Sequence, residues 1–147
     1  MSNLKTVSVN ATMADGFAIQ ANIDGHTVSI DQPTTAKGTG TGPTPLQMLL
    51  FAVGGCIGTI GRIVAFQQKI ALHGMQITVE GDYNPAGLMG KPSEDRVGFT
   101  EIRINAKIDA DLSEEQKAQF LDEVCHRCPL HDNLSHDSKL VSHLILD

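Results

Sequence analysis

Two short segments carry the residues best suited to chemistry. The first, "LLFAVGGCIGTIGR", places Cys56 near the middle of an uncharged, glycine-studded run. The second, "CHRCPLHD", holds Cys125 and Cys128. A thiolate can act as a nucleophile or a metal ligand, whereas a neutral thiol is a small hydrophobe that packs well in a core. Redox chemistry, metal binding and plain packing are therefore the three interpretations to separate.

Cys128 is the cysteine whose own neighbours favour reactivity. Pro129 disfavours helical backbone at the residue before it, so a helix should end near Arg127. If Pro129 opens a short helix, Cys128 is its N-cap, where free N–H groups and the helix dipole favour the thiolate. Cys56 lies about three turns inside its helix and would need a cation from elsewhere in the fold. Cys125 falls in the apolar stripe of its helix, which favours packing.

A metal site is a weaker interpretation of the second segment. Two sulfurs and two imidazoles occur at short spacings, on Cys125, Cys128, His131 and His136. The long loop that separates the two halves of a zinc finger is missing, so a tetrahedral arrangement is difficult. A thioredoxin-type pair of Cys125 and Cys128 is also weak, because that motif starts a helix after a strand. We expect no metal and no cofactor, and folding that is indifferent to a chelator.

The elements that must position these cysteines are visible in the hydropathy pattern. Apolar residues alternate with polar ones over 7–11, 17–23 and 28–30, and again over 77–79 and 102–108, which predicts strands. The segment "LVSHLIL", residues 140–146, predicts a last, buried strand. Thr44, Pro45 and Gln47 form a capping box that opens a helix over 46–66, apolar on all sides. A second box, Ser113 with Gln116, opens a helix that ends near residue 127. The order βββαββαβ predicts one α+β domain, residues 1–147, with a largely antiparallel sheet.

Composition excludes several classes of protein. The net charge is −6, with one Tyr and no Trp, so the chain offers neither a basic surface for phosphates nor an aromatic platform for bases. The first residues lack the apolar core of a secretory signal, and three cysteines do not make a disulfide framework. The compact apolar segment 46–57 is shorter than the ~20 residues of a membrane span. We expect a cytoplasmic protein with no nucleic acid and no membrane as partner.

The segment "GPTPLQMLLFAVGGCIG", followed some seventy residues later by "CHRCPL", resembles the OsmC/Ohr family of osmotically inducible and organic hydroperoxide resistance proteins. The resemblance spans nearly the whole chain. It implies an OsmC-like fold: antiparallel sheets around a long, central, glycine-rich helix, in an intertwined homodimer. The dimer would bury both sides of the apolar helix. It also implies thiol-dependent reduction of organic hydroperoxides, with an external dithiol as reductant.

The resemblance also implies roles for single residues. Cys56 would attack the hydroperoxide, and Cys128 would resolve the resulting sulfenic acid. Peroxidase members carry a Glu where this chain has Leu46, and an Arg in the N-terminal half, where this chain has none before Arg62. Lys37 and Gln47 are the local substitutes for supporting the thiolate, and slower turnover is expected. The alternative function is a non-catalytic dimer that binds a small ligand or senses redox state.

Overall fold

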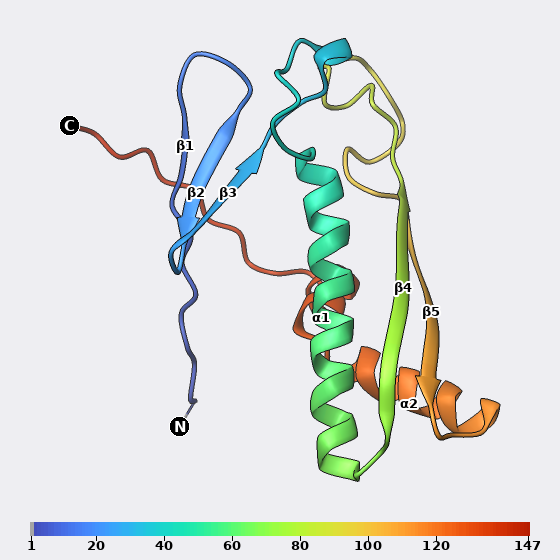
Figure 1. Ribbon diagram of the computed structural model, residues 1–147. Helices are drawn as coiled ribbons and strands as arrows, with labels where there is room; N and C mark the ends of the chain where they lie inside the picture. The colour runs from blue at the N-terminus through green and yellow to red at the C-terminus, as the bar shows by residue number, and fades with distance from the viewer. Residues whose placement is uncertain (1) are drawn as a thin grey trace. The chain divides into compact units, whose positions relative to one another are not determined.

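The computed structural model describes residues 2–147 as two compact units, Met1–Leu49 and Leu50–Asp147 (Figure 1). The first contains the strands β1 to β3 and a short 3-10 helix, η1 (Thr34–Ala36). The second contains most of the long helix α1, a two-stranded sheet and two further helices. All strand pairs are antiparallel, so the predicted α+β class is confirmed. The single domain over residues 1–147 stays a prediction.

The first unit is the predicted antiparallel meander. It contains β1 (Ala11–Met13), β2 (Ile19–Ile23) and β3 (His26–Ile30), paired in that order. Asp24 and Gly25 join β2 to β3 with positive φ angles of 49° and 83°, as their dipeptide predicts for a tight hairpin turn. β1 is shorter and later than predicted, since only three of its residues oppose β2. Alternation marks which face would be buried, but a strand also needs a partner.

The loop between β3 and α1 is organised around one buried carboxylate. Asp31, only 1% exposed, accepts hydrogen bonds from the backbone N–H and the hydroxyl of both Thr39 and Thr41. The Gln32 N–H donates to its other oxygen over 2.7 Å. A Cβ at Gly38 would overlap the Gln32 carbonyl, so glycine allows the chain to close around the carboxylate. The hydroxyl of Thr39, with the other donors, holds the pKa of Asp31 well below its usual range.

Asp31→Asn is expected to lower the melting temperature at neutral pH, because an amide NH₂ would face hydroxyl and N–H donors. Folding lowers the pKa of Asp31. The ionised carboxylate therefore stabilises the fold at pH values above its unfolded-state pKa of about 3.9, and this stabilisation is lost as pH falls through its folded-state pKa. The difference in melting temperature between the wild type and this variant should therefore shrink between pH 6 and pH 3. An equal difference at both pH values would contradict this account.

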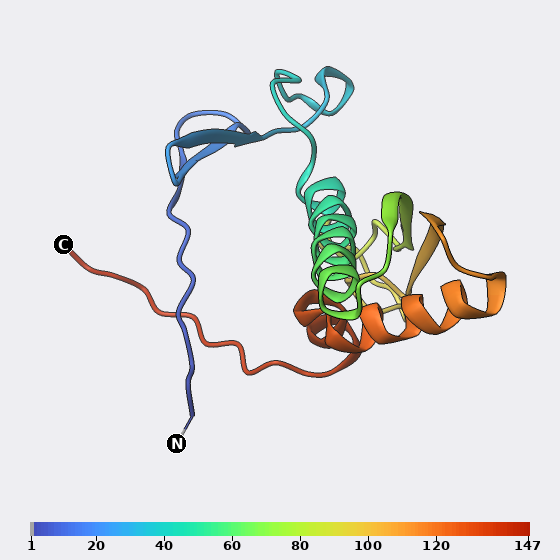
Figure 2. The same cartoon turned by 60° about the horizontal axis from the view of Figure 1, so that its bottom comes forward.

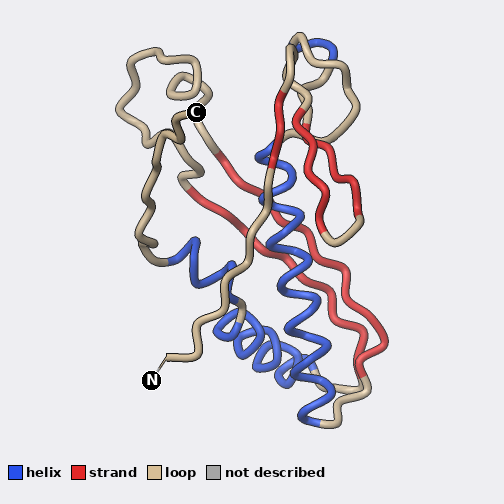
Figure 3. Tube along the Cα trace, turned by 90° about the vertical axis from the view of Figure 1, so that its left-hand side faces the viewer, coloured by secondary structure: helices blue, strands red, loops and turns tan. Residues whose placement is uncertain are grey.

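The second unit packs α1 along a long hairpin. α1 (Pro45–Gln68) lies beside β4 (Leu72–Asp82) and β5 (Glu101–Ala110), as Figures 1 and 3 show. α2 (Glu114–Arg127) crosses near the open end of this hairpin, where β4 begins and β5 ends (Figure 1). Both predicted capping boxes are present: Thr44 with Gln47, and Ser113 with Gln116. The short helix α3 (Pro129–Ser135) follows α2. The buried core is Val53, Ile57, Val64, Ala65, Leu72, Phe120, Val124 and Cys128.

The glycines of α1 allow close packing against β4. The three that face this strand are Gly54, Gly58 and Gly61. A Cβ at Gly58 would lie 3.6 Å from Ile77 Cδ1, and a Cβ at Gly61 would lie 2.8 Å from Met75 Sδ. This contact compensates for the helix propensity that each glycine gives up, about 1 kcal/mol relative to Ala.

In the part of the chain that the structure describes, α1 is also the one helix long and apolar enough to cross a membrane. Its 24 residues exceed the predicted compact apolar segment. Five of them are buried against other elements, namely Val53, Ile57, Gly61, Val64 and Ala65. Length and composition alone do not separate a membrane span from the core helix of a soluble protein, which passes the same test.

The last predicted strand is wrong. Residues 136–147 leave α3 as irregular extended chain (Figure 2). Leu144 and Ile145 are 85% and 89% exposed. In residues 2–147 no strand pairs with this segment. An apolar pattern cannot form a ladder alone, because its backbone groups need a neighbouring strand.

Candidate active site

The structure brings two of the three thiols together. Cys56 lies within α1, and Cys128 lies at the junction of α2 and α3, 72 positions later. Their Sγ atoms are 2.8 Å apart and share a hydrogen bond. Both thiols are free, and a disulfide of about 2.05 Å requires only a small further approach. Oxidation could therefore link them without refolding the second unit.

Local structure fixes Cys128 as the sequence predicts. It is the C-cap of α2 and the N-cap of α3, with extended backbone at φ −79° and ψ 116°. The His131 N–H donates to its Sγ over 3.4 Å, which is the N-cap contact. The side chain is fully buried. Pro129 forces the break between the two helices and so aims the thiol at α1.

Cys56 is not activated in this structure. Burial raises the pKa of its thiol, and the hydrogen bond with Cys128 raises it further, whereas the Leu130 backbone acts in the opposite direction. Within residues 2–147, no cation is among the groups that shift this pKa. This raised pKa agrees with the absence from this sequence of the Arg and Glu that peroxidase members carry. A small thiolate fraction at neutral pH means that attack by Cys56 is slow unless a ligand or a further group changes its surroundings.

We expect alkylation of Cys56 to follow a pH curve whose midpoint lies above the ordinary cysteine value of about 8.5. Cys128→Ala should move this midpoint down, because it removes the hydrogen bond and the like charge while most of the burial remains. Peptide mapping of iodoacetamide labelling between pH 6 and pH 10 measures both curves. A wild-type midpoint near pH 6 would show that an activating cation reaches the thiol.

Cys125 packs as a core residue. It is half-buried against the cluster that includes Cys128, and its pKa is raised by burial first and then by the charges of Cys128 and Asp122. A raised pKa disfavours the thiolate. Its predicted place in an apolar helix stripe is confirmed.

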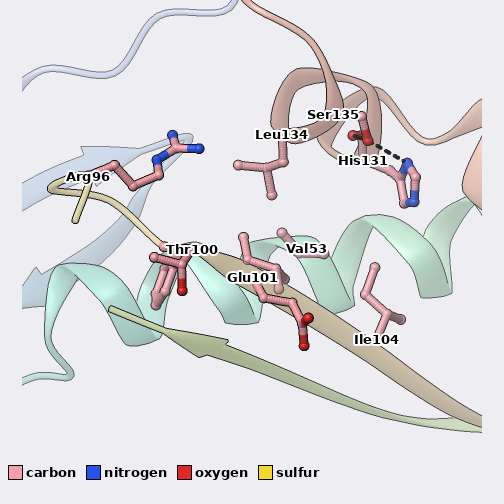
Figure 4. Close-up of a pocket in the computed structure, with 10 residues that line it drawn as sticks. Val53, Arg96, Thr100, Glu101, Ile104, His131, Leu134 and Ser135 are labelled. Atoms are coloured by element: carbon pink, nitrogen blue, oxygen red, sulfur yellow. Dashed lines mark hydrogen bonds between the residues drawn. The ribbon is translucent and has the colours of Figure 1, made fainter. Parts of the chain in front are cut away.

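The second unit contains a cavity of about 190 Å³ whose lining includes residues one helical turn from each of the two cysteines, Val53 and His131. Val53, one turn before Cys56 on α1, forms its floor, and Ile104 of β5 lies beside it (Figure 4). His131 and Ser135 of α3 form another side, with a 3.3 Å contact between Ser135 Oγ and His131 Nδ1. The remaining lining residues are Arg96, Phe99, Thr100, Glu101, Ile102 and Leu134. A small organic molecule in this cavity would therefore meet both apolar and polar side chains within one helical turn of each cysteine.

Both proposed supporting residues, Lys37 and Gln47, lie in the first unit. Gln47 accepts the Thr44 N–H over 2.9 Å, so its side chain serves the helix cap. Lys37 is the C-cap of η1, with a left-handed φ of 68°, and lies in the first unit. Their support for the thiolate stays a prediction.

The sequence analysis did not identify Arg96 as a site residue. This arginine comes from the loop between β4 and β5 and lines the cavity.

No metal site is formed by the predicted ligand set. Among residues 2–147, no group of three or more His, Cys, Asp or Glu side chains is arranged to hold a metal ion. His136 Nδ1 lies 3.3 Å from Asp132 Oδ1, and both side chains are exposed. The absence of a metal in solution remains an expectation.

The fold and the site define a class: α+β proteins in which a cysteine on a long central helix faces a second cysteine from a later helix junction. The family model described as OsmC-like protein matches residues 38–142. The chain therefore belongs to the OsmC-like protein family. This finding confirms the resemblance.

Curated relatives extend over most of the chain. A hydroperoxide reductase of Mycoplasma genitalium is 27% identical over 130 residues, covering 88% of this chain and 87% of the relative. A hydroperoxide reductase of Mycoplasma pneumoniae is 27% identical over 138 residues, covering 92% of each.

Solved structures share the fold. An OsmC-like protein from Mycoplasma pneumoniae superposes with a TM-score of 0.78 at 24% identity, covering 90% of this chain and 89% of the other. An organic hydroperoxide resistance protein from Vibrio cholerae, with captopril bound in one of its active sites, superposes with a TM-score of 0.65 at 20% identity. The match covers 92% of this chain and 90% of the other. At these identities the likeness establishes the OsmC-like fold alone.

Proposed function

We propose that this protein reduces organic hydroperoxides through Cys56 and Cys128, as part of defence against oxidative stress. The observation that carries the proposal is the 2.8 Å approach of the two sulfurs. A small, partly apolar cavity lined by Val53 and His131, one turn from each cysteine, supports it. The names of the two curated relatives, both hydroperoxide reductases, support the same chemistry.

The reaction proceeds in three steps: attack on the hydroperoxide, formation of the disulfide, and reduction of the disulfide. The Cys56 thiolate attacks the terminal oxygen of ROOH, the O–O bond breaks, and the alkoxide leaves as ROH after taking a proton. Cys56 is then a sulfenic acid. The Cys128 thiol attacks its sulfur, which forms the disulfide and releases water. An external dithiol reduces the disulfide by exchange and is itself oxidised to its own disulfide.

Cumene hydroperoxide consumption by the dithiol-reduced protein tests this proposal. One equivalent of the hydroperoxide should yield a disulfide between Cys56 and Cys128 in the peptide map, and a dithiol should restore the thiols. A folded protein that neither consumes the hydroperoxide nor forms the bridge would contradict the proposal.

A second candidate function has a specific observation in its favour. The pKa of Cys56 is raised by burial, with no cation to oppose it within the described residues. Such a thiol suits a protein that binds a small ligand in the cavity, or one that senses strong oxidants slowly. Ligand binding without hydroperoxide turnover would favour this alternative.

We also propose that the protein acts as a homodimer in the cytoplasm. On one side of α1, Phe51 and Phe66 remain 73% and 75% exposed, and Ala52 and Gly55 lie between them on the helix surface. Segments 3–10 and 140–146 carry exposed apolar residues in extended chain. Exposed apolar surfaces of this extent typically mark interfaces, and a second copy would supply both a helix and strands.

A further inference from the structure

The cavity that Val53 and His131 line combines apolar side chains, polar side chains and one arginine. Val53, Ile104 and Leu134 contribute aliphatic surface, and Phe99 adds an aromatic ring. Arg96 lines the same cavity from the loop between β4 and β5. An apolar body with an anionic end is the ligand that such a lining recognises.

The charge of Arg96 is not used by the protein itself. Among the described residues, no carboxylate lies within ion-pair distance of its guanidinium. It is also not among the groups that shift the pKa of Cys56. The guanidinium therefore retains its donors for a ligand.

The one carboxylate on the cavity wall is already paired. Arg103 Nη1 lies 2.7 Å from Glu101 Oε1. In Figure 4 the Glu101 carboxylate points away from Arg96, whose guanidinium extends from its loop toward Leu134. Glu101 thus does not cancel the positive charge at the Arg96 side of the cavity.

The guanidinium of Arg96 lies close to the backbone of Gly98. A Cβ added to Gly98 would lie 3.7 Å from Arg96 Nη2 and 3.8 Å from Nε, so the guanidinium passes over the Gly98 backbone. The guanidinium is exposed, and its planar set of donors matches the geometry of a carboxylate.

We propose that Arg96 selects hydroperoxides that carry a carboxylate, with a body about the size of a substituted benzene. The size follows from the volume: a cavity of about 150 Å³ holds benzene, and this one measures about 190 Å³. This inference rests on the proposed hydroperoxide reductase function, because it names the substrate class of that site. Arg96 is a specificity residue in this account and takes no part in the sulfur chemistry.

A matched set of substrates tests the proposal. Cumene hydroperoxide bearing a para-carboxylate is compared with the para-carboxamide, which has nearly the same shape and no charge. The wild type should show a kcat/KM for the acid about tenfold above that for the amide. Arg96→Gln should abolish this preference, and Arg96→Lys should restore part of it. Lys91→Gln, in the same loop but outside the cavity, should leave the preference unchanged.

A binding measurement separates this inference from the proposed function. In Cys56→Ser, 4-isopropylbenzoate should bind about tenfold more tightly than 4-isopropylbenzamide by calorimetry, and the additional Arg96→Gln change should remove the difference. If no hydroperoxide is consumed but this preference is found, the proposed function fails and the carboxylate site stands. Equal binding of acid and amide, or a preference that survives Arg96→Gln, would overturn the inference.

Discussion

Cys56→Ser should abolish hydroperoxide consumption, with a loss on the order of a thousandfold or more, because the atom that accepts the peroxide oxygen is gone. Cys125→Ser should retain most of the activity, since its half-buried side chain only packs against the core. This variant is the matched control, as it replaces a cysteine with serine in the same unit. Consumption of cumene hydroperoxide under a dithiol at fixed pH measures all three proteins.

Cys128→Ser should have a different signature. Without the resolving thiol 2.8 Å away, the sulfenic acid on Cys56 persists and is driven to sulfinic and sulfonic acids by further peroxide. Mass mapping after one equivalent and after ten equivalents would follow this change. In the wild type, Cys56 should instead be protected as the disulfide.

Two outcomes would contradict the assignment of Cys56 as the attacking cysteine and Cys128 as the resolving cysteine. A bridge between Cys125 and Cys128 as the dominant wild-type product would make these two residues the redox pair. If no cysteine oxidises at low peroxide concentration, the raised pKa of the buried Cys56 thiol prevents attack, and the ligand-binding function replaces the reductase.

The local parts of this site could be predicted from sequence because their causes are local. Pro129 ends one helix and opens the next, so the N-cap position of Cys128 follows from neighbouring residues alone. The capping pair Thr44 and Gln47 sets the start of α1 in the same way. The approach of Cys56 and Cys128 is long-range, and only the family resemblance indicated it.

Other features depend on tertiary contacts that no local pattern contains. Arg96 reaches the cavity because β4 and β5 form a hairpin whose loop returns toward α3. Asp31 is buried because Thr39 and Thr41 fold back over it, although the loop reads as plain glycine and threonine. The predicted strand over 140–146 failed for the opposite reason. Its pattern is clear, but among residues 2–147 it has no partner strand.

Phe51→Glu combined with Phe66→Glu should dissociate the proposed homodimer. Both rings lie on the side of α1 that the described chain leaves exposed, 73% and 75% respectively. Central aromatic residues of an interface each contribute about 2 kcal/mol or more, so burying two carboxylates in their place should raise the dissociation constant about a thousandfold. Sedimentation at micromolar protein should show about twice the 15.7 kDa chain mass for the wild type, and the chain mass for the variant.

Met89→Glu provides the control, because Met89 is also an exposed apolar residue, 65% accessible, but lies in the loop between β4 and β5. It should sediment like the wild type. Circular dichroism would show whether the double variant keeps its helices, so that dissociation can be told from unfolding. A wild type that sediments as a stable monomer would contradict the dimer. A double variant that still sediments as a dimer would place the interface elsewhere than on this face of α1, and the extended segments 3–10 and 140–146 would then be the surfaces through which two copies associate.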